Sequence, residues 1–150
     1  MYLPSIFMTI TSTAINAKEF IVEEYTCDGN NINPPLTFSE VPANAKSLVL
    51  IMDDPDAPGG TYTHWTIYNM SPATLQINEN SLPLGSKQGV NSSGKIGYYG
   101  PCPPSGQTHH YYFKLYAVDN SEELKEGASI EEVNQYIEGH IIEQAQLVGL

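Results

Sequence analysis

Hydrophobic and β-branched residues alternate with polar residues along much of the chain, in the period-two pattern of β-strands. Residues 8–13 alternate in this way, and residues 20–24 form a second short candidate. Residues 47–54 are apolar at consecutive positions, which is typical of a central strand buried on both faces. Residues 64–70 and 108–119 are rich in aromatic and β-branched types. The pattern therefore predicts a protein built mainly from β-strands.

One segment near the C-terminus has helical periodicity. Ser129 begins a capping box with Glu132, and apolar residues follow at helical spacing until Gly139. Residues 140–148 are compatible with more helix or with a returning strand, because periodicity does not separate the two. The stretch from 71 to 99 is long for a loop inside a compact domain. The expected architecture is mainly β, with antiparallel pairing and one or two helices near the C-terminus.

The composition limits the partners that the protein can have. The length is that of one ordinary domain, so we expect residues 1–150 to fold as a single unit. The formal net charge is −11, from 17 acidic residues against six basic ones, and all six are lysines. An acidic protein repels nucleic acids and anionic membranes, and without arginine it cannot form bidentate hydrogen bonds from a guanidinium group to phosphate. No apolar run is long enough to cross a membrane, so no integral membrane association is expected.

Two features bear on the cellular compartment. The segment Met1 to Met8 has no basic region ahead of an apolar run, which a secretory signal would have. A cytoplasmic location is therefore expected. Cys27 and Cys102 lie far apart in the sequence, and their separation in the fold cannot be judged from it. For a chain without a signal peptide, a buried, reduced pair is the favoured interpretation.

Polar side chains stand at the ends of three predicted strands, beside proline-rich loops. Asp54 and Asp56 follow the buried strand, His64 begins the next strand, and His109 and Tyr111 begin the longest one. Period two places His109 and Tyr111 on one face with apolar residues, as at the rim of a small-ligand cavity. The local pattern also fits a plainer interpretation, in which the histidines are hydrogen-bonded core residues and the aspartates cap a turn.

Two long motifs resemble the signatures of the phosphatidylethanolamine-binding protein (PEBP) family. The first is Asp53-Asp-Pro-Asp-Ala-Pro-Gly-Gly, followed by Thr63-His-Trp and Tyr68-Asn. The second is Gly97-Tyr-Tyr-Gly-Pro-Cys-Pro-Pro-Ser-Gly, followed by His109-His-Tyr and Phe113-Lys-Leu-Tyr-Ala-Val-Asp. Residues 25–36 resemble the bacterial and archaeal branch, often described as Raf-kinase-inhibitor-like. Two long motifs in the right order make this resemblance specific.

The resemblance implies a large antiparallel sheet packed on a smaller sheet, with a small pocket for phosphate-like anions. The residues that match the pocket are Asp54, His64, Gly100, His109 and Tyr111. The residues that match the supporting loop and the pocket wall are Asp56, Pro58 and Pro101. The resemblance also suggests a cis bond between Ala57 and Pro58. Tyr99 departs from the bacterial pattern, which has glycine there.

A pocket without arginine must hold an anion with other donors. Imidazole N–H groups, the Tyr111 hydroxyl and backbone N–H groups of a glycine-rich loop are the candidates. Asp54 is expected to accept a hydrogen bond from His64 and to favour its imidazolium form; alternatively, Asp54 is itself protonated when the anion binds. On the first hypothesis, anion affinity rises as pH falls through the histidine pKa.

The sequence is compatible with three functions. The first is non-enzymatic binding of a small anion, such as phosphate, sulfate, carboxylate or a phospho-headgroup. The second is a metal-dependent or other hydrolase that uses His64, His109 and Asp54. The third is regulation of a kinase or protease, as some relatives are described. The sequence has no metal-ligand spacing such as H-E-x-x-H and no G-x-S-x-G motif, so we expect no catalysis, metal or cofactor. Homodimers are common among such relatives, and one is expected here.

Overall fold

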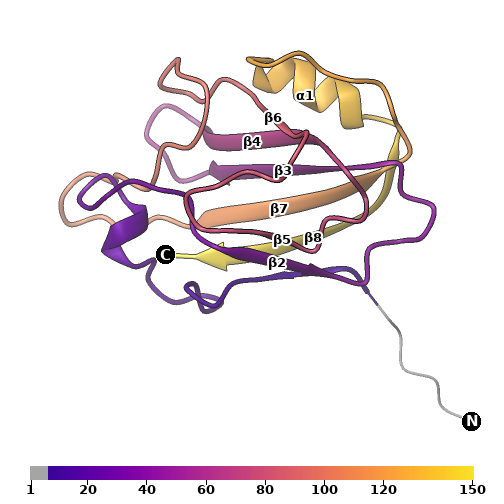
Figure 1. Ribbon diagram of the computed structural model, residues 1–150. Helices are drawn as coiled ribbons and strands as arrows, with labels where there is room; N and C mark the ends of the chain where they lie inside the picture. The colour runs from indigo at the N-terminus through magenta and orange to yellow at the C-terminus, as the bar shows by residue number, and fades with distance from the viewer. Residues whose placement is uncertain (1–6) are drawn as a thin grey trace, which may run out of the picture.

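Two antiparallel sheets form the framework of the structure, a computed structural model that describes residues 7–150 (Figure 1). The small sheet has the order β1-β2-β5, with β1 at Thr9–Thr11, β2 at Leu36–Ser39 and β5 at Gln76–Ile77. The large sheet has the order β6-β4-β3-β7-β8, with β6 at Lys87–Gln88, β4 at Tyr62–Met70, β3 at Ser47–Asp54, β7 at Tyr111–Val118 and β8 at Ile141–Gly149. The expected packing of a large sheet on a smaller one is confirmed.

The central strand β3 is buried along its whole length, as its unbroken apolar run predicts. Its side chains alternate between two cores. Leu50 and Met52 face the core between the two sheets. Val49 and Ile51 face a second core between the large sheet and the helix. Because both faces are covered by apolar layers, β3 holds the residue at its end, Asp54, in a fixed position.

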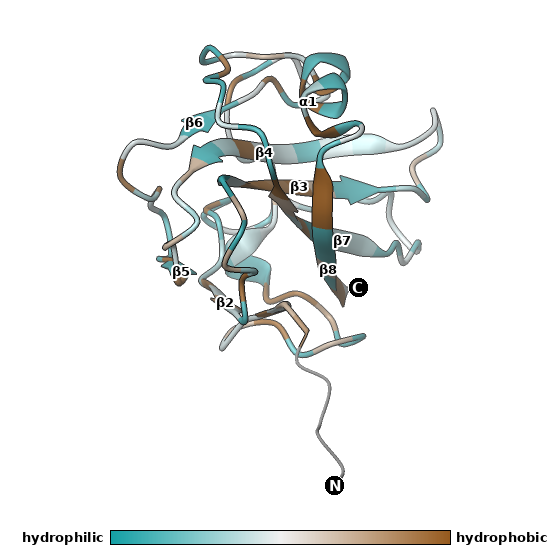
Figure 2. Cartoon of the chain, turned by 90° about the vertical axis from the view of Figure 1, so that its right-hand side faces the viewer, coloured by the Kyte–Doolittle hydropathy of each residue, from teal (hydrophilic) through white to brown (hydrophobic). Residues whose placement is uncertain are grey.

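The helix α1 (Ile130–Ile137) covers the outer face of the large sheet (Figure 2). Ser129 accepts a hydrogen bond from the backbone of Glu132, whose side chain accepts one from the Ser129 backbone, so the predicted capping box is confirmed. Gly139 follows the helix with a φ of 77°, a left-handed conformation that glycine adopts without strain. The chain then returns as β8, at Ile141–Gly149, beside β7, so of the two interpretations of residues 140–148 the returning strand is correct and only His140 lies outside it.

Two sequence-based expectations differ from the structure. Residues 20–24 are not a strand: they lead into a 3-10 helix, η1, at Glu23–Tyr25. Phe20 and Val22 are largely exposed and Ile21 between them is buried in the core, but the chain enters η1 directly after Val22, so the alternation stops after three residues. The segment 71–99 is not one long loop, because it contains β5, β6 and an isolated bridge between Val90 and Ile96. No helix among residues 7–150 is long and apolar enough to cross a membrane.

Candidate functional site

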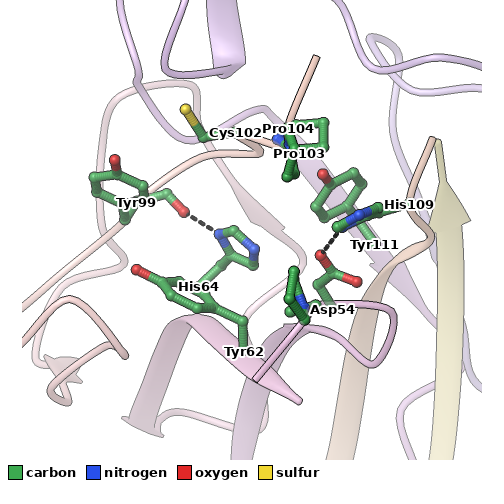
Figure 3. Close-up of a pocket in the computed structure, with 11 residues that line it drawn as sticks. Asp54, Tyr62, His64, Tyr99, Cys102, Pro103, Pro104, His109 and Tyr111 are labelled. Atoms are coloured by element: carbon green, nitrogen blue, oxygen red, sulfur yellow. Dashed lines mark hydrogen bonds and ion pairs between the residues drawn. The ribbon is translucent and has the colours of Figure 1, made fainter. Parts of the chain in front are cut away.

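Three strand ends meet at one edge of the large sheet. Because β4 and β7 both run antiparallel to β3, the last residue of β3 lies beside the first residues of its two neighbours. A cavity of about 320 Å³ opens at this point (Figure 3). Its lining residues are Asp54, Ala57, Pro58, Tyr62, His64, Tyr99, Cys102, Pro103, Pro104, His109 and Tyr111. Prolines and aromatic rings form most of the wall, and the side chains of Asp54, His64, His109 and Tyr111 stand at its floor.

A β-bulge turns His64 into this cavity. Met52 pairs with Trp65, and Asp53 pairs with Thr63, so His64 is the extra residue opposite that step. In a regular strand His64 and Trp65 would point to opposite faces of the sheet. Here Trp65 lies in the core between the sheets, and its neighbour His64 lines the cavity on the same side. The bulge therefore brings the imidazole next to the end of β3.

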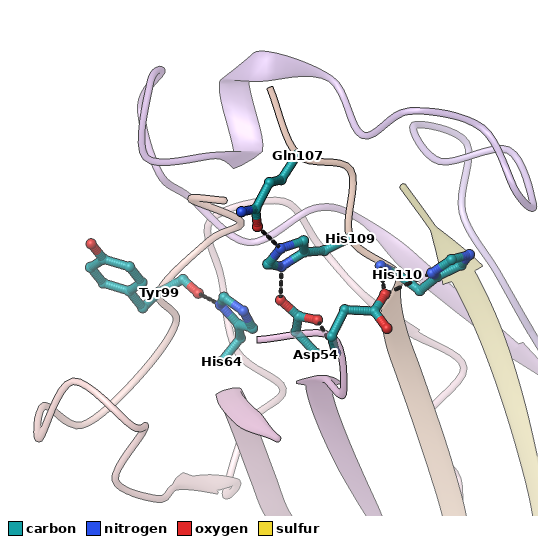
Figure 4. A network of polar contacts seen from close by, with 7 residues as sticks. Asp54, His64, Tyr99, Gln107, His109 and His110 are labelled. Carbon is teal, nitrogen blue, oxygen red and sulfur yellow. Dashed lines mark hydrogen bonds and ion pairs between the residues drawn. The ribbon is translucent and has the colours of Figure 1, made fainter. Parts of the chain in front are cut away.

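Asp54 pairs with His109. The Asp54 Oδ2 atom lies 2.6 Å from His109 Nδ1, and both side chains are buried. The other ring nitrogen of His109, Nε2, lies 2.9 Å from Gln107 Oε1 (Figure 4). Both nitrogens of this ring are therefore engaged by protein oxygens. The expected pairing of Asp54 with His64 is wrong, because the bulge turns His64 toward a different acceptor.

That acceptor is the backbone carbonyl of Tyr99, 2.5 Å from His64 Nδ1 (Figure 4). A carbonyl oxygen only accepts, so Nδ1 carries the hydrogen, and in the neutral ring Nε2 carries a lone pair. Burial lowers the pKa of His64; the Tyr99 hydrogen bond and the charges of Asp54 and Asp53 oppose this effect without cancelling it. His64 is thus a neutral imidazole at neutral pH, with Nε2 facing the open middle of the cavity (Figure 3).

The hydroxyl of Tyr111 is buried and has no hydrogen-bond partner among residues 7–150. Burial raises the pKa of Tyr111 far above its ordinary value, and the charges of Asp54 and Asp56 raise it further. The phenol therefore keeps its proton under all ordinary conditions. A buried hydroxyl without a partner costs free energy of about 1–3 kcal/mol, which a ligand acceptor in the cavity would recover.

Comparisons with known proteins identify the family of this chain. The family profile described as phosphatidylethanolamine-binding protein matches residues 11–150. The chain belongs to the PEBP family. It is 50% identical over 148 residues to a UPF0098 protein of the archaeon Methanothermobacter thermautotrophicus, covering 95% of this chain and 97% of that one. The family resemblance inferred from the two motifs is thereby confirmed.

Two solved structures share the fold of this PEBP-family chain. A PEBP homologue from Chlamydia trachomatis superimposes with a TM-score of 0.90 at 43% identity, covering 97% of each chain. YbcL of Escherichia coli, described as a member of the mammalian PEBP family, superimposes with a TM-score of 0.90 at 30% identity, covering 96% of this chain and 97% of that one. The UPF0098 name of the archaeal relative states no function.

The loop after β3 folds back without a cis peptide bond. No peptide bond in residues 7–150 is cis, so the expectation of a cis Ala57–Pro58 bond is wrong. Hydrogen bonds make the turn instead: the backbone N–H of Asp56 donates to Asp54 Oδ1, and that of Gly60 donates to the carbonyl of Ala57. Pro58 lines the cavity, as the resemblance implies.

Asp56 ties this loop to the chain ahead of β7. Its Oδ2 atom accepts hydrogen bonds from the backbone N–H of His110, at 2.8 Å, and from His110 Nδ1, at 2.7 Å. These bonds lower the pKa of Asp56. His110 and Asp56 are both exposed, whereas the neighbouring pair of His109 and Asp54 is buried. The two histidines point in opposite directions, as alternation along a strand predicts.

Gly100 and Pro101 take other places than the resemblance suggests. The backbone N–H of Gly100 donates to Asn31 Oδ1 at 2.7 Å, so it is already engaged, and Gly100 is not among the lining residues. A Cβ atom there would collide with the carbonyl of Tyr25, which explains the glycine by close packing. Pro101 lines a neighbouring cavity of about 300 Å³, which shares Pro103, His109 and Tyr111 with the first.

Cys27 and Cys102 form a disulfide, which corrects the expectation of a reduced pair. The backbone N–H of Cys27 donates to the carbonyl of Pro101, and the hydroxyl of Tyr98 donates to the carbonyl of Tyr25. These bonds bring two segments together that are separated by 75 residues in sequence. The disulfide therefore fastens the cavity wall to the segment that follows η1.

Several residues in and behind the cavity are not among the site residues that the motifs imply. They are Ala57, Tyr62, Tyr99, Cys102, Pro103, Pro104 and, behind His109, Gln107. Tyr62 lies two residues before His64, so period two alone would place the two on one face. Among residues 7–150, no group of three histidine, cysteine or acidic side chains is arranged to hold a metal ion.

Proposed function

We propose that this PEBP-family protein binds a small phosphate-like anion without chemical transformation. The single observation that supports this most strongly is the Tyr111 hydroxyl, a buried donor without a partner at the floor of the cavity. An anion oxygen is the acceptor that best satisfies such a donor. The apolar wall of prolines and tyrosine rings would hold an uncharged group attached to the anion.

The charge of the protein shapes this function. The lining residues include no lysine, and the chain as a whole carries a net charge of −11. Long-range steering therefore opposes an approaching anion, so its capture depends on short-range hydrogen bonds inside the cavity. A modest affinity with strong geometric selection is the result expected of such a site. Regulation of a kinase or protease, a homodimeric state and a cytoplasmic location stay predictions.

Calorimetric titration with inorganic phosphate tests the proposal. Tyr111→Phe removes one oxygen atom and should weaken phosphate binding by about tenfold or more, because a hydrogen bond to a charged group contributes about 1.5–3 kcal/mol. Tyr112→Phe is the matched control, since Tyr112 is next in sequence and lies outside the cavity. The absence of saturable binding, or equal affinities in both variants and the original protein, would overturn the proposal.

A further inference from the structure

The cavity floor offers one free donor and one free acceptor. The donor is the Tyr111 hydroxyl, which has no partner among the described residues. The acceptor is His64 Nε2: Nδ1 is bound to the Tyr99 carbonyl, and no described residue bonds Nε2 (Figure 3). The ring nitrogens of His109 are both taken, by Asp54 and Gln107. A ligand at this floor therefore meets an O–H group on one side and a lone pair on the other.

The surroundings of His64 keep its ring neutral. The titratable groups that line the cavity with it come from all the elements packed around it: Asp54 on β3, Tyr62 on β4, Tyr99 in the wall, and His109 and Tyr111 at the start of β7. Asp53 lies outside the cavity, paired with Lys114, and acts on His64 only through its charge. His64 is only 4% exposed, and burial of a charged ring is unfavourable. The apolar wall leaves little water to solvate an imidazolium.

A fully ionised oxyanion fits this floor poorly. All its oxygens are acceptors, so one of them would face the His64 lone pair, and the Asp54 carboxylate would add repulsion. An oxyanion that still carries one proton fits well. Its O–H group donates to His64 Nε2, and a second oxygen accepts from the Tyr111 hydroxyl.

We infer that the cavity selects protonated oxyanions, with phosphate monoesters bound as their monoanions and sulfate esters rejected. This inference rests on the proposed function and specifies the ligand class of the same site. The discrimination comes from one hydrogen atom, since a phosphate monoester monoanion and a sulfate ester have the same charge and nearly the same shape. A binding site rejects a close analogue most strongly when binding of that analogue would leave a buried polar group unpaired.

Phenyl phosphate and phenyl sulfate are the matched probes. The second pKa of a phosphate monoester is about 6, so phenyl phosphate is largely a monoanion at pH 5.5, whereas phenyl sulfate has no acidic proton at any pH used. Calorimetric titrations at fixed ionic strength from pH 5.5 to 8 would measure both affinities. At pH 5.5 we expect phenyl phosphate to bind about tenfold more tightly or better. Above pH 6 its affinity should fall by about tenfold per pH unit as the monoanion is depleted.

The possible outcomes separate the two claims. Equal affinities for the two esters at pH 5.5, or a phenyl phosphate affinity that rises with pH, would overturn the inference and leave anion binding intact. Binding of neither ester at any pH would overturn the proposed function and the inference with it. His64→Gln supplies an amide that both donates and accepts, so the preference for phosphate should fall to about onefold to twofold. His140→Gln, an exposed histidine paired with Asp119, is the control and should keep the preference.

Discussion

His109 Nδ1 and Asp54 Oδ2 lie 2.6 Å apart in a buried pair, and His110 and Asp56, one and two residues further along their segments, repeat the contact at 2.7 Å on the surface. The chemistry of the two pairs is the same, and their burial is opposite. The chain thus contains its own control for the contribution of burial to a histidine–aspartate pair. The inner pair holds the start of β7 against the end of β3, and the outer pair ties the loop after β3 to the chain ahead of β7.

A double-mutant cycle on each pair should give very different coupling energies. For His109→Gln with Asp54→Asn we expect a coupling of about 1–3 kcal/mol in the free energy of unfolding, because neither partner is solvated when the other is lost. For His110→Gln with Asp56→Asn we expect about 0.2–1 kcal/mol, since water screens the exposed pair. Urea unfolding of the single and double variants measures both. Similar couplings for the two pairs would contradict this account.

Removal of the disulfide should lower the stability without abolishing the fold. The Cys27–Cys102 bond closes a loop across 75 positions, and bonds that close long loops stabilise by about 2–4 kcal/mol, chiefly by restricting the unfolded chain. Cys27→Ser with Cys102→Ser should lower the free energy of unfolding by that amount, measured by urea unfolding. A thiol assay on the purified protein is the check: two free thiols in the denatured, unreduced chain would show that the bond does not form.

The sequence pattern predicts those parts of the fold that obey strict periodicity. The consecutive apolar residues from Leu48 to Met52 indicate burial on both faces, and the structure buries them between two apolar layers. Alternation from His109 onward places Phe113 and Leu115 on the same face as His109. Both Phe113 and Leu115 are fully buried in the core. The capping box at Ser129 likewise marks where the helix begins. In each case the signal is local and has a direct steric cause.

The candidate site depends on features that break periodicity. The bulge at His64 shifts one side chain to the other face of the sheet, and no residue type at that position indicates it in advance. The hydrogen-bond partner of His64 follows from that shift, and Asp54 pairs with His109 instead of His64. The disulfide depends on the approach of two distant loops, which spacing along the chain does not encode. Residue types were therefore predictable, whereas their pairing was not.

Acid should remove a stabilising contribution of His64. Its folded pKa lies below the unfolded value of about 6.5, so protons bind preferentially to the unfolded chain. The contribution of the neutral ring is fully present above pH 6.5 and is lost as pH falls through the folded pKa. The stability difference between the original protein and His64→Gln should therefore be constant above pH 7 and should shrink below pH 6.5. Calorimetric melting from pH 5 to 8 measures it, with His140→Gln as the control. A difference that grows on acidification would contradict the burial of a neutral ring.

A methyl group at Gly100 should displace the backbone next to the cavity and lower the stability of the protein. Its Cβ would collide with the backbone carbonyl of Tyr25 and lie 2.7 Å from Asn31 Oδ1, so the backbone itself must move. Gly100→Ala should cost about 1–3 kcal/mol of unfolding free energy, as overpacking does. Gly59→Ala is the matched control, because nothing lies within 4 Å of a Cβ there, and it should change stability by less than about 0.5 kcal/mol.

The same substitution should weaken ligand binding, although Gly100 does not line the cavity. The neighbouring residue Tyr99 supplies the carbonyl that holds His64 Nδ1, at a distance of 2.5 Å. If Gly100 moves, that carbonyl moves with it, and the His64 ring loses the bond that directs its lone pair toward the ligand. Titration with phenyl phosphate should then show a lower affinity in Gly100→Ala and an unchanged one in Gly59→Ala. Full affinity in a destabilised Gly100→Ala variant would mean that the Tyr99 carbonyl does not set the orientation of His64.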